Sequence, residues 1–108
     1  MKSINLSLLF FFLFSINSYS LPPCEGDNFR SWDNCEGTVT FDDGISRYIG
    51  EYKDGLPDGK GTVTFANGEK YVGEFKMGLP NGKGAYTFTN GEKYVGEFID
   101  GIPIEMIR

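Results

Sequence analysis

The sequence has no histidine, two cysteines and one tryptophan among 108 residues. Without histidine, the side chain that most often acts as general base and metal ligand is missing, and two cysteines alone cannot complete a four-ligand zinc site. A chain of this length also holds at most one small domain. We therefore expect no enzymatic activity, no metal site and no cofactor, and no nucleic-acid partner for a chain with a formal net charge of −5.

The amino terminus has the pattern of a secretory signal peptide. Lys2 precedes an apolar run over residues 4–16, and Ser18 and Ser20 supply the small side chains typical of a cleavage site. The run has about 13 residues whereas a membrane span needs roughly 20, so an uncleaved anchor is the less favoured alternative. Prolines directly before Cys24 disfavour lipidation. We predict cleavage after Ser20 and a mature chain that is secreted or periplasmic.

The rest of the sequence repeats with a period of 23 residues. The stretches 48–70 and 71–93 are identical at 16 of 23 positions, without a gap. A third copy starts at residue 94 and is truncated, and residues 37–47 match the second half of a unit in degenerate form. Atypical end units are expected in stacked repeats. The predicted divisions are a signal peptide (1–20), an irregular segment (21–36) and a repeat domain (37–108) with units at 37–47, 48–70, 71–93 and 94–108.

Within each unit, apolar and polar residues alternate with a period of two, which is typical of half-buried strands. Asn67-Gly68, Asn90-Gly91 and Asp43-Gly44 tolerate the left-handed backbone of tight hairpins. At the other end of the hairpins we predict a Pro-Asp-Gly turn, within residues 55–59 in the first full unit. Glycine recurs too often for a long helix. The sequence therefore predicts an all-β fold, a single curved antiparallel sheet of consecutive hairpins.

The alternation also assigns the two faces of this sheet. One face carries aromatic residues interleaved with glycines, because a glycine leaves room for a ring over bare backbone and lets a sheet bend. We predict that this face forms the core, together with Val39 and Val63. Its aromatic residues are Phe41, Tyr48, Tyr52, Phe65, Tyr71, Phe75, Tyr86, Phe88, Tyr94 and Phe98, and its glycines are Gly50, Gly61, Gly73, Gly84 and Gly96. The opposite face is predicted to be charged, with Glu51, Lys53, Lys60, Thr62, Glu74, Lys76, Lys83, Thr87 and Glu97.

The unit at 71–93, YVGEFKMGLPNGKGAYTFTNGEK, resembles the MORN repeat (membrane occupation and recognition nexus). The resemblance rests on the Tyr-x-Gly-Glu-aromatic opening and the later Gly-x-Gly, and it covers residues 37–103. It implies a ribbon of hairpins that takes part in protein interaction or associates with acidic phospholipids, without catalysis by the repeats. The lead-in around Cys24 and Trp32 resembles that of small secreted bacterial proteins of this type. The repeat-defining residues are Tyr48, Gly50, Glu51, Gly55, Gly59, Gly61, Phe65, Tyr71, Gly73, Glu74, Phe75, Gly78, Gly82, Gly84, Phe88, Tyr94, Gly96, Glu97 and Phe98.

Cys24 and Cys35 follow the predicted export signal closely. In an oxidising compartment such a pair is expected to form a disulfide, worth roughly 3 kcal/mol for a loop of this size. A reactive cysteine is the less favoured alternative, because no histidine and little positive charge lie nearby in the sequence to lower a thiol pKa. Trp32, inside the loop, is predicted to pack on the exposed end of the aromatic face, with ligand stacking as the secondary interpretation.

Two recurring patterns suggest chemistry on the charged face. Glu51, Glu74 and Glu97 recur once per unit, about 9.5 Å apart if two strand spacings separate them, a separation also found between the carboxylates of inverting glycosidases. A catalytic pair needs unlike environments, whereas a repeat makes like ones, so we interpret them as cross-strand partners of lysines. The Gly-Lys-Gly of 59–61 and 82–84 lacks the spacing and helix of a phosphate-binding loop and is interpreted as turn structure.

Three functions remain open at this point. The favoured hypothesis is an exported, non-catalytic interaction or scaffold module that binds protein through a surface or a strand edge. Association with acidic membrane surfaces is the second, although the net charge of −6 expected for the mature chain, 9 basic against 15 acidic side chains, opposes it. Binding of envelope glycans through exposed aromatic rings is the third. Near the carboxyl terminus, five apolar residues are predicted to cap the last hairpin, or alternatively to form an adhesive edge: Ile102, Pro103, Ile104, Met106 and Ile107.

Overall fold

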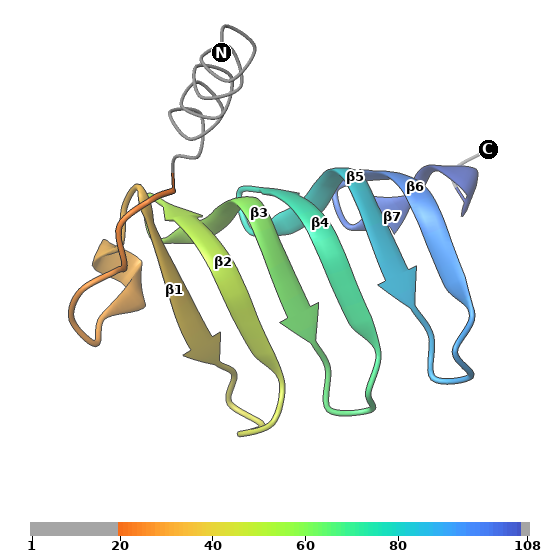
Figure 1. The fold of residues 1–108 in the computed structure, drawn as a ribbon, viewed down its shortest axis with the longest axis horizontal. Coiled ribbons are helices and arrows are strands. Elements are labelled where there is room, and N and C mark those ends of the chain that lie inside the picture. Colours follow the sequence, from red (N-terminus) through yellow and green to blue (C-terminus); the bar gives the residue numbers. More distant parts are fainter. Residues whose placement is uncertain (1–19, 107–108) are drawn as a thin grey trace, which may run out of the picture.

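A computed structural model describes residues 20–106, so the predicted signal peptide lies almost entirely outside the described residues. The described chain forms one open antiparallel sheet of seven strands in the order β1-β2-β3-β4-β5-β6-β7, each strand pairing with the next along the chain (Figure 1). The predicted all-β fold is confirmed. Its elements are η1 (Phe29–Ser31), β1 (Cys35–Thr40), β2 (Arg47–Lys53), β3 (Leu56–Thr64), β4 (Lys70–Lys76), β5 (Leu79–Thr87), β6 (Lys93–Ile99), β7 (Ile102–Pro103) and η2 (Ile104–Met106), the η elements being single turns of 3₁₀ helix.

The hairpins that join β1 to β2, β3 to β4 and β5 to β6 have tight turns, as the Asn-Gly and Asp-Gly pairs predict. Between β3 and β4, the Phe65 amide donates to the Glu69 carbonyl at 2.8 Å and the Gly68 amide donates to the Phe65 carbonyl at 2.9 Å. Gly68 has a φ of +92°, and the Asn67 side chain accepts the Glu69 amide at 2.9 Å. Glycine is needed here because the turn closes through the left-handed region.

The first of these turns is longer, as its extra residue requires. The Asp43 carboxylate accepts the amides of Ile45 and Ser46 at 2.8 and 2.7 Å, and the Ser46 hydroxyl donates to the same carboxylate. These hydrogen bonds, the one from the Ser46 hydroxyl most of all, hold the pKa of Asp43 below its usual value. Ser46 also accepts the Ala66 amide at 2.9 Å, so the buried hydroxyl ties the first turn to the second.

The turns at the other ends of the strands, which join β2 to β3, β4 to β5 and β6 to β7, differ from the predicted Pro-Asp-Gly turn. Pro57, Asp58 and Gly59 belong to β3, and the chain reverses instead at Asp54-Gly55, with φ values of +52° and +78°. Two consecutive left-handed residues make the two-residue turn whose twist suits an antiparallel hairpin. The Met77-Gly78 and Asp100-Gly101 pairs have the same conformation.

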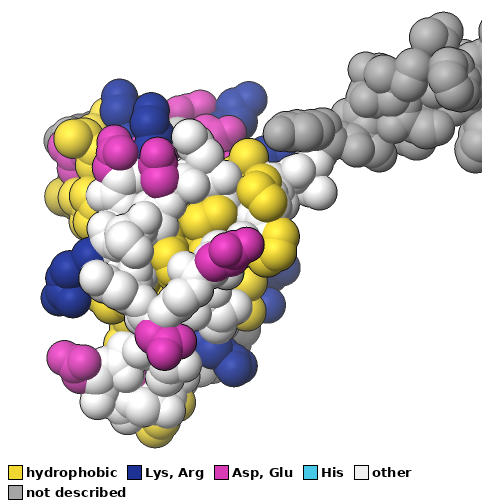
Figure 2. Space-filling view, turned by 90° about the vertical axis from the view of Figure 1, so that its left-hand side faces the viewer, with side chains coloured by type: hydrophobic (Ala, Val, Ile, Leu, Met, Phe, Trp, Pro, Cys, Tyr) yellow, Lys and Arg dark blue, Asp and Glu magenta, His cyan; other side chains and the backbone are white. Residues whose placement is uncertain are grey.

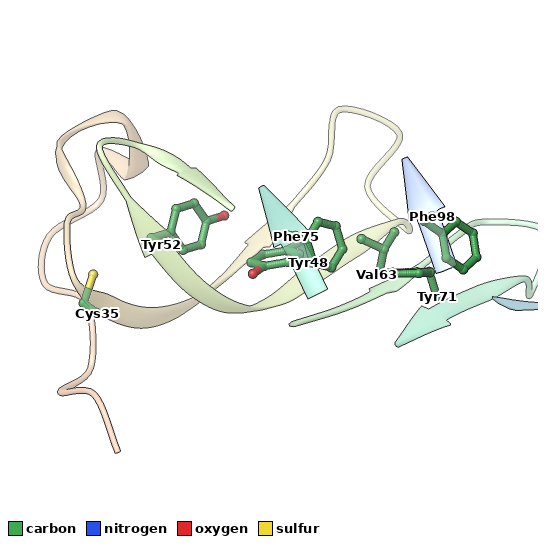
Figure 3. Close-up of a cluster of buried hydrophobic side chains, with 7 residues drawn as sticks. All are labelled: Cys35, Tyr48, Tyr52, Val63, Tyr71, Phe75 and Phe98. Carbon is green, nitrogen blue, oxygen red and sulfur yellow. The ribbon is translucent and has the colours of Figure 1, made fainter. Parts of the chain in front are cut away.

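The buried side chains lie on one face of the sheet and form a row. Figure 3 shows them as one elongated cluster that follows the sheet from Cys35 to Phe98. Tyr48 and Tyr71 are 0 and 1% exposed, and Val63 is buried as predicted, whereas Val39 is partly buried. The remaining core residues are Cys35, Tyr52, Phe75 and Phe98. A single sheet without a covering layer therefore obtains its core by laying large rings flat on its own backbone.

The segment before β1 closes that end of the sheet. Cys24 and Cys35 form the predicted disulfide, with their Cα atoms 4.9 Å apart. The Cys24 amide donates to the Glu36 carbonyl and the Glu36 amide donates to the Pro22 carbonyl, each at 2.9 Å. Trp32 packs edge-on against Tyr52, with ring centroids 5.0 Å apart, which confirms its predicted place at the end of the aromatic face.

Candidate interaction surface

The ring of the tyrosine that opens each unit lies over glycines. The ring of Tyr71 covers Gly73 and Gly84, so that a methyl group added at Gly84 would overlap the ring. Its hydroxyl donates to the Glu74 carbonyl of its own strand at 2.8 Å. Tyr48 repeats this arrangement over Gly50 and Gly61, with its hydroxyl 2.8 Å from the Glu51 carbonyl, and Tyr94 lies over Gly96 alone. The aromatic-plus-glycine pattern is therefore a requirement of packing.

Seven rings form a continuous chain of edge-to-face contacts along the core. Neighbouring centroids are 4.9 to 5.3 Å apart and the ring planes are close to perpendicular, a favourable arrangement for aromatic quadrupoles. Burial raises the pKa of Tyr52 and Tyr71 to about 12 and raises that of Tyr48 as well. In order, the chain runs Trp32, Tyr52, Tyr48, Phe75, Tyr71, Phe98, Tyr94.

The same face also carries aromatic residues that reach the surface. Phe41, Phe65 and Phe88 precede the three tight turns and are 40, 36 and 37% exposed. Tyr86 lies between the last two, with ring centroids 6.2 Å from Phe65 and 5.0 Å from Phe88, and its hydroxyl donates to the Glu69 carboxylate at 2.6 Å. Burial, followed by this hydrogen bond, raises the pKa of Tyr86 to about 12. The row of phenylalanines is thus the part of the aromatic face available to a partner.

An apolar hollow of about 440 Å³ lies next to this row. Its lining includes Phe41 and Phe65 of the exposed row, residues 78–80 at the start of β5, and three rings of the ring chain, those of Tyr71, Phe75 and Phe98. Seen along the sheet from the β1 end, hydrophobic side chains reach the surface beside acidic ones (Figure 2). The aromatic face is therefore partly open, which the sequence could not decide.

The repeated glutamates are structural hydrogen-bond acceptors. The Glu51 and Glu74 carboxylates accept the backbone amides of Lys60 and Lys83, at 3.2 and 3.3 Å, where the strand register shifts. The cross-strand interpretation is confirmed for Glu74, which faces Lys60, and for Glu97, which faces Lys83. It is wrong for Glu51, which faces Glu36. The carboxylate binds the bulged backbone and not the lysine side chain. Because Glu51 and Glu74 make the same contact, their carboxylates lack the unlike environments that a catalytic acid and base need.

The remaining glycines of the motif fall at strained or crowded positions. Gly59 and Gly82 have φ values of +101° and +102°, and the carboxylates of Glu51 and Glu74 lie directly against them. A carboxylate in this place opposes a bound phosphate. The interpretation of Gly-Lys-Gly as turn structure is wrong, because residues 59–61 and 82–84 lie within β3 and β5. Gly55 is buried, and a side chain there would meet the Arg30 carbonyl at 2.5 Å.

The charged face carries two rows that the sequence interpretation did not single out. Cross-strand neighbours Thr38, Ile49, Thr62, Val72, Ala85 and Val95 form an apolar and threonine row across β1 to β6. Beside it, Thr40, Arg47, Thr64, Lys70, Thr87 and Lys93 form a row with three basic side chains and no acidic one. Aligning the strands by register would have revealed both rows, because each row contains one residue from each of the strands β1 to β6.

The described residues were also compared with the requirements of a metal site and of a membrane-spanning helix. Within residues 20–106, no group of three histidine, cysteine or acidic side chains is placed to hold a metal ion. None of the helices in that range is long and apolar enough to cross a membrane.

Comparison with known proteins identifies the repeats. No curated protein matches the chain. The MORN repeat family model matches residues 48–70 and 71–93, the two units that are most alike in sequence and that fold into β2 to β5 with the following turns. Residues 48–93 of this chain therefore belong to the MORN repeat family.

Proposed function

We propose that this chain is an exported, non-catalytic module that binds another protein through the open part of its aromatic face. The observation that carries the proposal is the exposed row of Phe41, Phe65 and Phe88 beside the apolar hollow. An exposed aromatic surface on a small soluble domain costs solubility unless a partner covers it, and such patches mark interaction sites. MORN repeats commonly serve in protein or membrane interaction, which agrees with this assignment.

Export is supported by two independent features. The first twenty residues have the composition of a signal peptide. The Cys24–Cys35 disulfide is compatible with an oxidising compartment, where such bonds persist.

The test compares capture by two matched double variants. Phe65→Ser with Phe88→Ser removes exposed rings from the aromatic face, and Lys53→Ser with Lys76→Ser changes exposed side chains on the opposite face. The mature protein and the lysine variant are expected to retain the same envelope protein on a column, and the phenylalanine variant to lose it. Equal retention by all three would overturn the assignment, provided circular dichroism shows each variant folded.

Association with an acidic membrane surface is a second candidate, and one observation favours it. The row containing Arg47, Lys70 and Lys93 concentrates positive charge on one face of an acidic chain. Each basic residue near anionic headgroups contributes about 1 kcal/mol. Co-sedimentation with phosphatidylglycerol vesicles at low salt tests this candidate: binding that disappears when all three residues are changed to serine would support it, and no binding would exclude it.

A further inference from the structure

The outer edge of β6 is open over most of its length. The Phe88 amide donates to the Glu92 carbonyl at 2.8 Å, so the backbone groups of Glu92, Tyr94 and Gly96 face β5. Because these groups alternate along an antiparallel strand, those of Lys93 and Val95 face away from β5. Within residues 20–106, β7 pairs only with Phe98 and Ile99 and leaves Lys93 and Val95 without a neighbouring strand. Figure 1 shows this edge at the end of the sheet, with β7 and η2 at one extremity of β6.

The same sequence is fully paired one unit earlier. Tyr94–Phe98 reads YVGEF, identical to Tyr71–Phe75, and β4 is joined there by β5. In that pair Lys70 faces Thr87, Val72 faces Ala85 and Gly73 faces Gly84. An incoming strand on β6 in the same register would meet Lys93, Val95 and Gly96 in turn.

Two side chains of β6 are arranged for such a strand. The Glu74 carboxylate accepts the Lys83 amide from β5, whereas no donor to the Glu97 carboxylate lies within residues 20–106. The Tyr71 ring is 1% exposed between two glycines, whereas Tyr94 covers only Gly96 and stays half-buried. A residue other than glycine opposite Gly96 would overlap the Tyr94 ring, as it would overlap Tyr71 at Gly84. The open edge therefore selects for a glycine at one position.

Strands of a second copy do not meet this requirement. In β1, Gly37-Thr38-Val39-Thr40 repeats the sequence of residues 61–64, but Trp32 lies over Gly37 in the place that an incoming tyrosine would take. The edge of β1 at Glu36 is also occupied by Pro22 and Cys24. A second β6 has one glycine, Gly96, which its own Tyr94 covers. The strands β3 and β5 are paired on both sides.

We propose that the β6 edge is a strand-accepting site for an extended segment of another protein. The segment runs antiparallel to β6, with glycine opposite Gly96, a small residue opposite Val95 and an apolar residue opposite Tyr94. Main-chain hydrogen bonds to Lys93 and Val95 supply affinity, and the glycine supplies selectivity. The inference rests on the proposed role in protein binding and assigns a separate surface to it.

A synthetic peptide of residues 82–89, GKGAYTFT, serves as the probe because it contains the residues that complement Tyr71, Val72 and Gly73. It omits Leu79 and Pro80, because Ile102 and Pro103 of β7 take the equivalent place on β6. Added to the full mature protein, it is expected to slow amide hydrogen exchange at Lys93 and Val95. The same peptide with Gly84→Ala is expected to bind at least about tenfold more weakly, a difference that titration calorimetry or chemical-shift titration measures. Equal binding of both peptides, or no binding of either, would overturn the proposal.

Two protein variants complete the test. Val95→Pro removes an outward-facing amide that the fold does not use, so this variant is expected to melt like the wild type and to lose peptide binding. Val95→Thr retains the amide and is expected to bind. Peptide binding by Val95→Pro would overturn the proposal, and so would a dimer of the wild type, in sedimentation equilibrium, that Val95→Pro abolishes. The Phe65→Ser, Phe88→Ser variant is expected to bind the peptide normally, which separates this site from the aromatic surface.

Discussion

The two ends of the sheet are finished in opposite ways. At the β1 end, the segment before the strand imitates the half-unit that would stand there. The Gly55 amide donates to the Trp32 carbonyl at 2.8 Å, as the Gly78 amide donates to the Pro57 carbonyl at 2.9 Å one hairpin later. At the β6 end, β7 pairs with two residues of β6, and no other strand within the described residues pairs with the rest of that edge.

The imitation at the β1 end extends to side chains. The Asp33 carboxylate accepts the Asp54 amide at 2.9 Å, in the way that Asp58 accepts the Met77 amide at 3.2 Å. Trp32 then lies over Gly37, where an interior unit would place its tyrosine. At the β1 end, the preceding segment both accepts the turn amide of Gly55 and covers the end of the aromatic core with Trp32. At the β6 end, the turn hydrogen bond of Gly101 is made, but Tyr94 is left half-buried. A repeat array can therefore be closed at one end and remain receptive at the other.

Alkaline pH is expected to have the largest effect, because it acts on the covered interior. Folding raises the pKa of Tyr52, Tyr71 and Tyr86 to about 12, against about 10 in the unfolded chain. The stabilisation is thus complete below pH 10 and is lost as the pH rises from 10 to 12. As the pH rises from 10 to 12, the absorbance of tyrosinate is expected to increase while the circular dichroism signal of the sheet decreases over the same range. Ionisation near pH 10 without unfolding would show that the rings are not buried in solution.

The Trp32→Ala variant sharpens this comparison at the capped end. Removing the indole exposes Tyr52, so the pKa of Tyr52 is expected to fall from about 12 toward 10 while the variant stays folded at neutral pH. An unchanged titration curve would contradict the capping role of Trp32.

Alanine at two equivalent glycines compares the interior with the open end. Gly84→Ala places a methyl group in the ring of Tyr71, which is 1% exposed and cannot move. We expect it to lower the free energy of unfolding by about 3 kcal/mol, the upper range for overpacking. Gly96→Ala is expected to cost about 1 kcal/mol, because Tyr94 is only half-buried while no strand is bound to the β6 edge. Urea denaturation measures both. Equal losses would show that Tyr94 is packed as rigidly as Tyr71.

Removing the disulfide is the next largest expected change. The double variant Cys24→Ala, Cys35→Ala opens a loop with a sequence separation of 11 and is expected to lose about 3 kcal/mol. Because Trp32 is positioned inside that loop, its fluorescence is expected to shift toward that of an exposed indole. A melting temperature equal to that of the oxidised wild type would mean that the sheet does not depend on its cap.

The strand pattern and the faces could be predicted from sequence because they follow from local rules. Alternation with a period of two, together with the glycine spacing, predicts which side of β4 holds Tyr71 and Phe75. The Cys24–Cys35 disulfide and the position of Trp32 were predicted from compartment and polarity, and both are confirmed.

The features missed by sequence are those that depend on tertiary position. Met77 adopts a φ of +51° although its side chain has no preference for the left-handed region, so the turn was placed three residues too late. Trp32-Asp33 shares only its aspartate with Pro57-Asp58. Asn34, with a φ of +51°, adds a residue between Asp33 and β1. The half-unit before β1 is therefore visible only from its hydrogen bonds.

Alanine at the repeated glutamates is expected to have the smallest effect and to compare the two ends most directly. Glu74 accepts the Lys83 amide at the register shift of β4 and β5, so Glu74→Ala is expected to cost about 1 kcal/mol, the usual contribution of one hydrogen bond. Glu97 has no such donor within residues 20–106, and Glu97→Ala is expected to leave stability within about 0.5 kcal/mol of the wild type. Thermal melts of the two variants test this difference. If the strand-accepting site binds the peptide of residues 82–89, the ranking changes on addition of the peptide, because the Glu97 carboxylate then accepts an amide as the Glu74 carboxylate already does. The peptide would in that case stabilise the wild type more than Glu97→Ala, and an equal shift for both would show that the Glu97 carboxylate takes no part in strand addition.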